Sequence, residues 1–232
     1  KYTHLGRPLR FYGGISSAYI VTCNIFCKMC WAGDNVFKPG KTGRFYSPEE
    51  VFLGLVKCAT RHNHQIISVS GGEITLGRDH LLSLLEHVEA SKFQFVCESN
   101  GLLLGHDPQY VSELSRFDRT HFRISLKGSN KEEFSRITGA RPEAYQLQYK
   151  ALENLIAAGV SVNACLMASF STEEDIQNVI TRLEAIHPGI LKSLEIESIS
   201  LFPQVKKRLE KAGLKPRRIR HRGRIIQLDT PQ

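Results

Sequence analysis

Three cysteines lie close together near the start of the chain: Cys23, Cys27 and Cys30, in the segment Cys-Asn-Ile-Phe-Cys-Lys-Met-Cys. Thiolates bind zinc and iron–sulfur clusters. A structural zinc site uses four protein ligands, and a ferredoxin-type cluster uses four thiolates. No fourth cysteine follows closely here. The spacing therefore indicates either a centre whose fourth ligand comes from elsewhere in the chain, or an iron–sulfur cluster with one iron left open to a small molecule.

The other three of the six cysteines, Cys58, Cys97 and Cys165, stand alone among 232 residues. This is too sparse for a disulfide scaffold, and lone cysteines are usually small buried apolar side chains, so we predict no role for these three. Hydrophobic residues make up 41% of the chain and charged residues 23%, as in soluble globular proteins. No apolar run approaches the roughly 20 residues that span a bilayer. We predict a cytoplasmic protein without membrane contact.

The elements that must position the cysteines follow from hydrophobic periodicity. Apolar runs bounded by turn residues predict six strands, at Ile15–Thr22, Gln65–Ser70, Phe93–Glu98, His121–Leu126, Val160–Ala168 and Ser193–Ile199. Stretches of helical period follow them, at Pro48–Thr60, His80–Ser91, Pro108–Arg116, Lys131–Ile137, Ala144–Ala158 and Glu173–His187. This alternation predicts a parallel α/β sheet. A closed barrel needs eight units, so six predict an open sheet or one curled part of the way toward a barrel.

Residues that terminate helices support this pattern. In the runs Ser47-Pro48-Glu49-Glu50 and Ser171-Thr172-Glu173-Glu174, a hydroxyl group precedes acidic residues and can cap the first free N–H groups of a helix. Gly159 and Gly213 lie where helix ends need a residue that adopts positive φ.

Polar and small residues follow the first four predicted strands. The cysteine run follows the first strand, and the segments Ser70–Glu73, Glu98–Gly101 and Leu126–Gly128 follow the next three. The loops at the carboxyl ends of parallel strands carry the active sites of α/β proteins. We therefore expect these four segments to meet at one edge of the sheet.

Two of these segments carry a resemblance to a known family. The CxxxCxxC spacing of Cys23, Cys27 and Cys30 after the first strand, together with Gly71-Gly72-Glu73 after the second, resembles the radical S-adenosylmethionine (radical SAM) superfamily over about residues 15–200. The resemblance implies a partial (β/α)₆ TIM-like barrel, which we expect to form a core domain of residues 1–203.

The resemblance also implies cofactors and a reaction. Cys23, Cys27 and Cys30 would hold three irons of a [4Fe–4S] cluster, and the amino and carboxylate groups of S-adenosylmethionine would chelate the fourth. One electron, from a reductant such as flavodoxin or ferredoxin, then cleaves S-adenosylmethionine. The product is a 5′-deoxyadenosyl radical that abstracts hydrogen from a substrate, which the sequence does not identify.

The resemblance implies further binding residues in the loops after the second and third strands. Gly71, Gly72 and Glu73 are the candidates for the methionine amino group, with a simple turn as the alternative interpretation. Ser99 and Asn100 are the candidates for the ribose hydroxyl groups, and a polar strand end is the alternative.

Other candidates lie on the fourth and fifth strands and the helix between them. Lys127 is expected to pair with the methionine carboxylate, and Ser125, two residues earlier, shares its side of the strand. Arg136 is a further cation for the same group, and Met167 would pack on adenine. The alternatives are a solvated lysine and an ordinary core methionine. Trp31 would either shield the cluster or fill a gap.

The end of the chain is strongly basic. Residues 206–224 hold Lys206, Lys207, Arg208, Lys211, Lys215, Arg217, Arg218, Arg220, Arg222 and Arg224 against one acid, Glu210, whereas the whole chain has a formal charge of +8. Such a run is usually a solvated or disordered tail. The functional alternative is a surface for tRNA or an acidic protein. We treat residues 204–232 as a basic C-terminal extension.

Two classes of function remain open from the sequence. The first is a small radical SAM enzyme, similar to glycyl-radical-enzyme activases and 7-carboxy-7-deazaguanine synthases. Ser125-Leu126-Lys127 resembles the Asp-Leu-Lys of the activases, with Ser125 in place of the aspartate. The second is a non-catalytic iron–sulfur or zinc-binding protein with a basic tail that binds RNA or protein.

Overall fold

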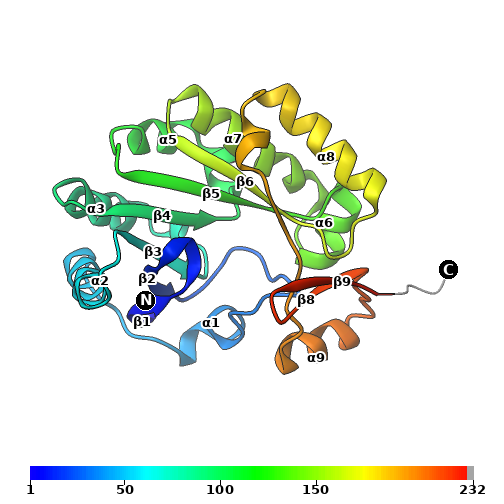
Figure 1. Ribbon diagram of the computed structural model, residues 1–232, viewed down its shortest axis with the longest axis horizontal. Coiled ribbons are helices and arrows are strands. Elements are labelled where there is room, and N and C mark those ends of the chain that lie inside the picture. The colour runs from blue at the N-terminus through cyan, green and yellow to red at the C-terminus, as the bar shows by residue number, and fades with distance from the viewer. Residues whose placement is uncertain (229–232) are drawn as a thin grey trace.

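A curved seven-stranded sheet forms the centre of the protein, whose computed structural model describes residues 1–228 (Figure 1). The strands lie side by side in chain order, and β2 to β7 are parallel. Their bounds are β1 (Tyr2–Leu9), β2 (Ile15–Ile20), β3 (Ile66–Gly71), β4 (Gln94–Ser99), β5 (Thr120–Lys127), β6 (Ser161–Met167) and β7 (Glu195–Glu197). The six predicted strands correspond to β2–β7, so the predicted parallel sheet is confirmed.

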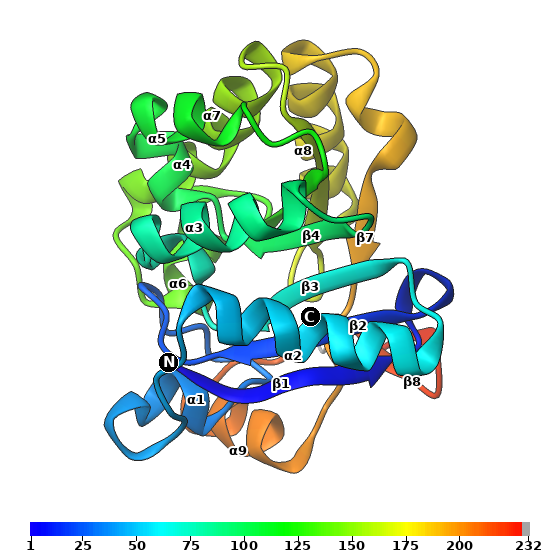
Figure 2. The same ribbon diagram turned by 90° about the vertical axis from the view of Figure 1, so that its left-hand side faces the viewer.

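Long helices cover the convex side of this sheet, as Figures 1 and 2 show. In chain order, all the α-helices of the described residues, short ones included, are α1 (Asp34–Phe37), α2 (Pro48–His62), α3 (Arg78–Glu89), α4 (Leu102–His106), α5 (Pro108–Leu114), α6 (Lys131–Thr138), α7 (Tyr145–Ala157), α8 (Glu173–Ile186) and α9 (Pro203–Lys211). The six predicted helices correspond to α2, α3 and α5–α8. The result is a partial TIM-like barrel, because the curved sheet holds six parallel strands rather than eight.

The predicted helix ends are also confirmed. Ser47 and Glu50 form a capping box, in which Glu50 N donates to Ser47 Oγ over 3.1 Å and Ser47 N donates to Glu50 Oε2 over 2.7 Å. Thr172 forms the same box at the start of α8. Gly159 and Gly213 have φ of +72° and +63°. Within residues 1–228, no helix has the length and apolarity needed to cross a membrane.

The first strand was not predicted. β1 pairs antiparallel with β2, from Leu9 opposite Ile15 to Tyr2 opposite Ile20. Two shifts of register interrupt this pairing. Because each bulge moves the following side chains to the other face of the sheet, the regular alternation that reveals a strand is lost.

The basic end of the chain is folded through residue 228, so its interpretation as a disordered tail is corrected. α9 is followed by a hairpin of β8 (Arg218–His221) and β9 (Arg224–Gln227). Val205, Leu209 and Leu214 are buried in the same hydrophobic core as the barrel. The guanidinium of Arg218 pairs with Glu173 of α8 at 2.7 Å. The division of the chain after residue 203 remains a proposal.

A buried carboxyl group in α6 gives the first prediction. Glu133 accepts hydrogen bonds from Ser129 and Ser171, and burial raises the pKa of Glu133 above the ordinary carboxyl value of 4.5. Because the pKa of Glu133 is higher in the folded state than in the unfolded state, Glu133 stabilises the fold most below pH 4.5, where the carboxyl group is protonated. This stabilisation is lost as the pH rises through the raised pKa and the buried group ionises. The free energy of unfolding of Glu133→Gln minus that of the wild type should therefore increase as the pH rises above 4.5.

Denaturant unfolding at a series of pH values measures this difference. The matched control is Glu132→Gln, which changes an exposed neighbour on the same helix. A difference that stays constant with pH for Glu133→Gln would contradict the prediction.

Candidate active site

The three clustered cysteines lie in a loop of residues 21–33, the cysteine loop, which follows β2 directly. Two of its backbone N–H groups bind the end of α6: Phe26 N donates to the carbonyl of Thr138 over 3.2 Å, and Lys28 N donates to that of Ile137 over 2.7 Å. The last carbonyls of a helix have no partner within the helix. The loop therefore caps α6, and α6 in turn fixes the backbone between Cys23 and Cys30.

The thiol groups are buried to different extents. Cys27 is buried, and Cys23 and Cys30 are half-buried. Burial raises the pKa of Cys23 to about 11 and that of Cys27 to about 12, and the positive charge of Lys127 acts in the opposite direction on both thiols. Metal binding to such thiols must release protons, because the ligand is the thiolate.

The sulfur atoms of the cysteine loop are not gathered as closely as a single zinc ion would hold them. Zinc binds thiolates at about 2.3 Å in a tetrahedron, which puts the sulfurs about 3.8 Å apart. Among residues 1–228, one set of three potential metal ligands has all its ligand atoms within 4.8 Å of one another, and it consists of Cys165, Glu195 and Glu197. The sulfur atoms of Cys23, Cys27 and Cys30 do not meet this distance criterion.

The Gly71–Glu73 segment lies against the beginning of the cysteine loop. Gly72 N donates to the carbonyl of Ile20 over 3.0 Å, and Glu73 N donates to that of Thr22 over 2.8 Å. Gly71 has a φ of +99°, and a Cβ added to Gly72 would lie 2.0 Å from the carbonyl oxygen of Thr22. Only glycine at position 72 permits this close approach.

Gly72→Ala should therefore displace this segment from the cysteine loop. We expect a loss of about 1–3 kcal/mol in the free energy of unfolding from overpacking, and weaker binding of S-adenosylmethionine by about tenfold or more. Thermal unfolding and calorimetric titration measure the two effects. Gly77→Ala is the matched control, because its Cβ would make an ordinary contact of 3.6 Å with His80. Equal behaviour of the two variants would contradict the prediction.

The carboxylate of Glu73 is 2% exposed and is fully engaged within the protein. Its Oε1 atom accepts from Thr75 N at 3.1 Å, Thr75 Oγ1 at 2.6 Å and Ser99 Oγ at 2.9 Å. Its Oε2 atom accepts from Asn100 N at 2.7 Å. The Glu73 side chain therefore joins the loops after β3 and β4, which leaves the backbone of its segment as the part available to a ligand.

Asn100 extends this network to the cysteine loop. Its Nδ2 donates to Asn24 Oδ1 over 2.7 Å and lies 3.7 Å from the sulfur of Cys23. Ser99 is buried, and its hydroxyl also accepts from Gly101 N at 3.0 Å. The structure thus brings the segments after β2, β3 and β4 together, as the sequence predicted for the carboxyl ends of parallel strands.

The candidates on β5 share one side of that strand. Lys127 Nζ donates to Ser125 Oγ over 2.5 Å. Lys127 also lies opposite Met167 of β6 in the sheet, and Met167 is half-buried. Arg136 is exposed on α6. The structure therefore brings Ser125 and Met167 beside Lys127.

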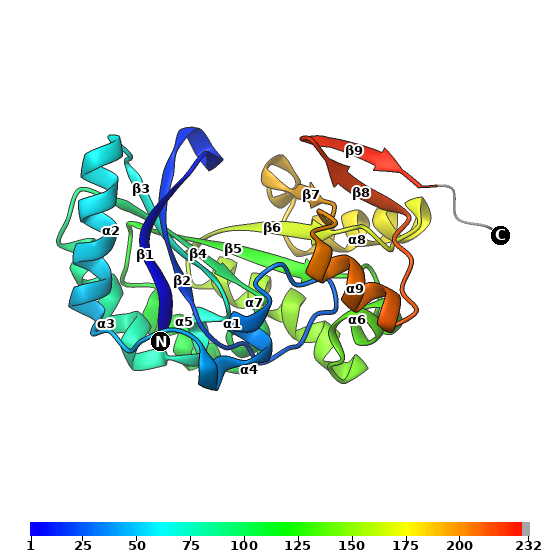
Figure 3. The same ribbon diagram turned by 90° about the horizontal axis from the view of Figure 1, so that it is seen from below.

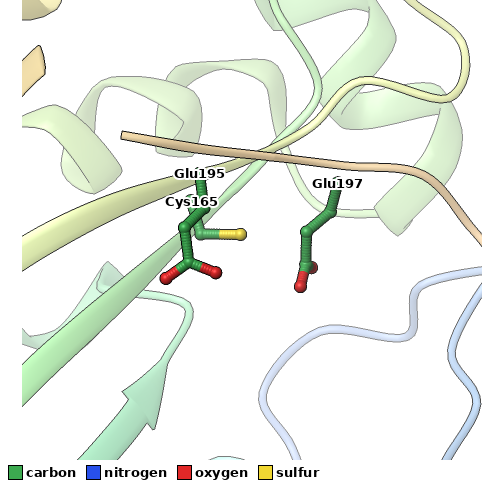
Figure 4. Close-up of side chains that lie close together, drawn as sticks. All are labelled: Cys165, Glu195 and Glu197. Carbon is green, nitrogen blue, oxygen red and sulfur yellow. The ribbon is translucent and has the colours of Figure 1, made fainter. Parts of the chain in front are cut away.

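Sequence reasoning missed a charged network on the inner side of β5, β6 and β7. Arg123 is buried and binds Glu195 through two hydrogen bonds, Nε to Oε1 at 3.1 Å and Nη2 to Oε2 at 2.9 Å. The same Nη2 donates to Glu197 at 2.6 Å and to the sulfur of Cys165 at 2.8 Å. Figure 4 shows the side chains of Cys165, Glu195 and Glu197 close together. Because the guanidinium contacts all three, the cation of this cluster is Arg123 and not a metal ion.

The network reaches two more strands. Ser70 Oγ of β3 donates to Glu98 Oε2 of β4 over 2.6 Å, and the other oxygen of Glu98 lies 3.9 Å from Arg123 Nη1. Burial acts to raise the pKa of Glu195, but the hydrogen bonds and positive charge of Arg123, together with hydrogen bonds from Asn163 and Tyr12, outweigh it and keep the pKa below its ordinary value. Charged residues at alternating positions of otherwise apolar strands, such as Arg123 and Lys127, are the sequence signal that could have revealed this network.

The fold and site define a partial barrel that carries a three-cysteine loop at the carboxyl end of its parallel strands. Residues 18–183, more than half of the chain, match the family model described as the Radical SAM superfamily. The chain therefore belongs to the radical SAM superfamily, whose members use a [4Fe–4S] cluster and S-adenosylmethionine.

Individual relatives agree with this membership. The probable GTP 3′,8-cyclase of Methanosarcina acetivorans is 26% identical over 193 residues, which cover 80% of this chain and 54% of the relative. Streptococcus suis SuiB bound to S-adenosylmethionine has a similar fold, with a TM-score of 0.62, 16% identity and coverage of 79% of this chain and 41% of SuiB. HydG of Carboxydothermus hydrogenoformans gives a TM-score of 0.60 at 14% identity, over 85% of this chain and 50% of HydG. The chain thus spans about half the length of these relatives.

Proposed function

We propose that this chain is a radical SAM enzyme that cleaves S-adenosylmethionine and uses the resulting radical to abstract hydrogen from a substrate. The observation that carries the proposal is the cysteine loop, whose beginning the Gly71–Glu73 segment contacts through backbone hydrogen bonds. A [4Fe–4S] cluster bound there supplies the electron that breaks the sulfonium bond and yields the 5′-deoxyadenosyl radical. The residues present fit this group, because three thiols lie in one fixed loop.

Each part of the site has a proposed role. Cys23, Cys27 and Cys30 hold three irons. The carbonyl groups of Gly71–Glu73 accept hydrogen bonds from the methionine amino group, since the side chain of Glu73 is occupied. Lys127 pairs with the methionine carboxylate, and its charge already acts at the neighbouring thiols.

The remaining candidates line the nucleoside side of the site in this proposal. Asn100, which lies beside Cys23, is the candidate for the ribose hydroxyls, and Ser99 orients it through the carboxylate of Glu73. Met167, opposite Lys127 in the sheet, is the candidate to pack on adenine. Arg136 is exposed on α6 and is the weakest candidate for the carboxylate.

The substrate stays unidentified, and the relatives differ in this respect. One is named for GTP, and another is seen with a precursor peptide bound. The proposal therefore concerns the shared first step of the reaction. Its partners are S-adenosylmethionine, a one-electron reductant and a substrate, with tRNA or an acidic protein as a candidate for the basic C-terminal residues.

Anaerobic reconstitution tests the proposal. The expected result is about four irons per chain and, with dithionite and S-adenosylmethionine, release of 5′-deoxyadenosine. Stoichiometric zinc in a stable site, with no 5′-deoxyadenosine, would refute the enzyme and favour the non-catalytic metal-binding protein.

A further inference from the structure

The inner face of the curved sheet is polar. On β2, Ala18 and Ile20 belong to the hydrophobic core under the helices, whereas Tyr19, between them, points to the other face and lies beside Ser70 of β3. The inner positions of the neighbouring strands hold Ser68, Ser70, Glu98, Arg123, Ser125, Lys127, Asn163, Cys165, Glu195 and Glu197. The interior of a closed barrel is filled mainly by Val, Ile and Leu. This inner face therefore suits a polar ligand better than a packed core.

Two contacts join the ends of the sheet across this face. At the carboxyl ends of the strands, Arg208 of α9 donates from Nε to the carbonyl of Lys28 over 3.2 Å and from Nη2 to that of Cys30. At the amino ends, Tyr12 OH, in the turn between β1 and β2, donates to Glu195 Oε1 of β7 over 3.1 Å. Figure 3 shows this turn near β7. The open side of the partial barrel is thus bridged at both ends.

Glu195 pairs with Arg123 at the centre of the inner face. Glu195 Oε1 accepts from Arg123 Nε at 3.1 Å and from Asn163 Nδ2 at 2.9 Å, and its Oε2 accepts from Arg123 Nη2 at 2.9 Å. Within residues 1–228, the ion pairs of Glu98 and Glu197 are both with the same guanidinium. Three carboxylates therefore share one positive charge, which leaves an excess of two negative charges.

Glu98 and Glu197 each keep one carboxylate oxygen free of hydrogen bonds. Glu98 Oε2 accepts from Ser70 Oγ at 2.6 Å, whereas Glu98 Oε1 lies 3.9 Å from Arg123 Nη1, beyond hydrogen-bond distance. Glu197 Oε1 accepts from Arg123 Nη2 at 2.6 Å, and no donor among the described residues binds its Oε2. The side chains of Glu98 and Glu197 are 38% and 33% exposed. Each free oxygen can therefore accept from a ligand.

A buried hydroxyl group faces the same place. Tyr19 is only 8% exposed, and its hydroxyl makes no hydrogen bond within the part of the chain that the structure describes. Burial raises the pKa of Tyr19, the charge of Arg7 opposes this rise, and the charge of Glu98 adds to it, so Glu98 lies near the hydroxyl. A tyrosine hydroxyl can donate or accept. A ligand between Tyr19 and Glu98 would supply the missing partner.

We propose that Glu98, Glu197 and Tyr19 bind a protonated amino group of the substrate. The inference rests on the proposed function, in which Lys127 is engaged by the methionine carboxylate and does not compensate the acids. An ammonium group offers a positive charge and three N–H donors, which match the excess negative charge, the two free carboxylate oxygens and the hydroxyl oxygen. Glu197 lies beside Met167 in the sheet, and Met167 lies beside Lys127. The amine is thus held next to the nucleoside end of the site.

Binding of small probes tests the proposal. The probes n-pentylammonium, n-pentanol and pentanoate share a chain length and differ in charge. Titration of the cluster-free protein, followed by ligand-observed NMR, should show that the ammonium binds about tenfold or more tightly than the alcohol, because hydrogen bonds between charged groups are the stronger ones. Pentanoate should bind more weakly than either.

Removal of the two charges should abolish this preference. In Glu98→Gln/Glu197→Gln each amide oxygen can still accept the internal hydrogen bond of its carboxylate, while the free oxygen is replaced by a donor. The affinity for n-pentylammonium should fall about tenfold or more. The matched control Glu49→Gln/Glu132→Gln removes the same charge from exposed positions on α2 and α6 and should leave the affinity unchanged.

Tyr19→Phe is a second, independent variant. It removes a hydroxyl that has no internal hydrogen bond among the described residues, so the melting temperature should stay the same while n-pentylammonium binds severalfold more weakly. If the double glutamine variant fails to fold, Tyr19→Phe alone decides the outcome.

Two results would overturn the proposal. One is an affinity for n-pentylammonium that does not exceed that for n-pentanol. The other is binding of n-pentylammonium that the folded variants leave unchanged. A protein that binds the ammonium through these residues, but takes up no cluster and releases no 5′-deoxyadenosine, supports the amine site and refutes the proposed function alone, because the titration uses cluster-free protein.

Discussion

Replacement of Cys27 by alanine should abolish both cluster assembly and cleavage of S-adenosylmethionine. Cys27 is buried at the centre of the loop, and its removal leaves two thiols to hold a centre with four irons. Loss of a group that only orients a metal ligand costs roughly 10–100-fold in metal affinity, and loss of the ligand itself costs more. We expect release of 5′-deoxyadenosine to fall more than about 100-fold, with a matching loss of bound iron, both measured after anaerobic reconstitution.

Cys58→Ala is the control for this experiment. Cys58 is also a buried free cysteine, but it lies on α2 and outside the cysteine loop. This variant should keep its iron and its activity. A Cys27→Ala protein that retains iron and activity would contradict the assignment of the three cysteines as cluster ligands.

The second large effect is expected from Glu73→Gln. Each oxygen of the Glu73 carboxylate accepts from at least one donor, and these donors include the backbone N–H groups of Thr75 and Asn100. In either orientation, the NH₂ group of glutamine faces one of these donors in a buried site. The unsatisfied buried donor and the loss of charge together should lower the free energy of unfolding by about 2–4 kcal/mol. The melting temperature should fall by about 5–15 °C as a result.

Thermal unfolding measures this effect, and Glu132→Gln on the exposed side of α6 is the control. The control should shift the free energy of unfolding by less than about 0.5 kcal/mol. Binding of S-adenosylmethionine to the folded variant should also weaken, because Glu73 holds Asn100 beside the cysteine loop. A melting temperature equal to that of the wild type would show that the Glu73 network does not stabilise the fold.

Most of the barrel could be predicted because its strands and helices have regular hydrophobic periods. β2–β6 are largely buried parallel strands, and such strands form continuous apolar runs. β1 escaped prediction because bulges interrupt its pattern. α9 escaped because only Val205 and Leu209 mark its buried side among many charged residues.

The site was predictable where its residues are close in the chain. The cysteine spacing is local, and the contact of Ser125 with Lys127 follows from the alternation of side chains along a strand. The network around Arg123 was not predictable in the same way, because its partner Glu195 lies 72 positions along the chain. The same holds for Glu73, whose partner Ser99 lies 26 positions away on the next strand.

The contact between Arg208 and the carbonyl of Lys28 joins residues 180 positions apart. A ribosome adds about 5–20 residues per second, so about 10–40 s pass between the synthesis of the two. During that interval the thiols exist on the nascent chain without the contacts that α9 provides. Iron that reaches the nascent chain would therefore encounter a cysteine loop that α9 does not yet hold in place. Iron that reaches the complete polypeptide would encounter the loop with its α9 contacts formed.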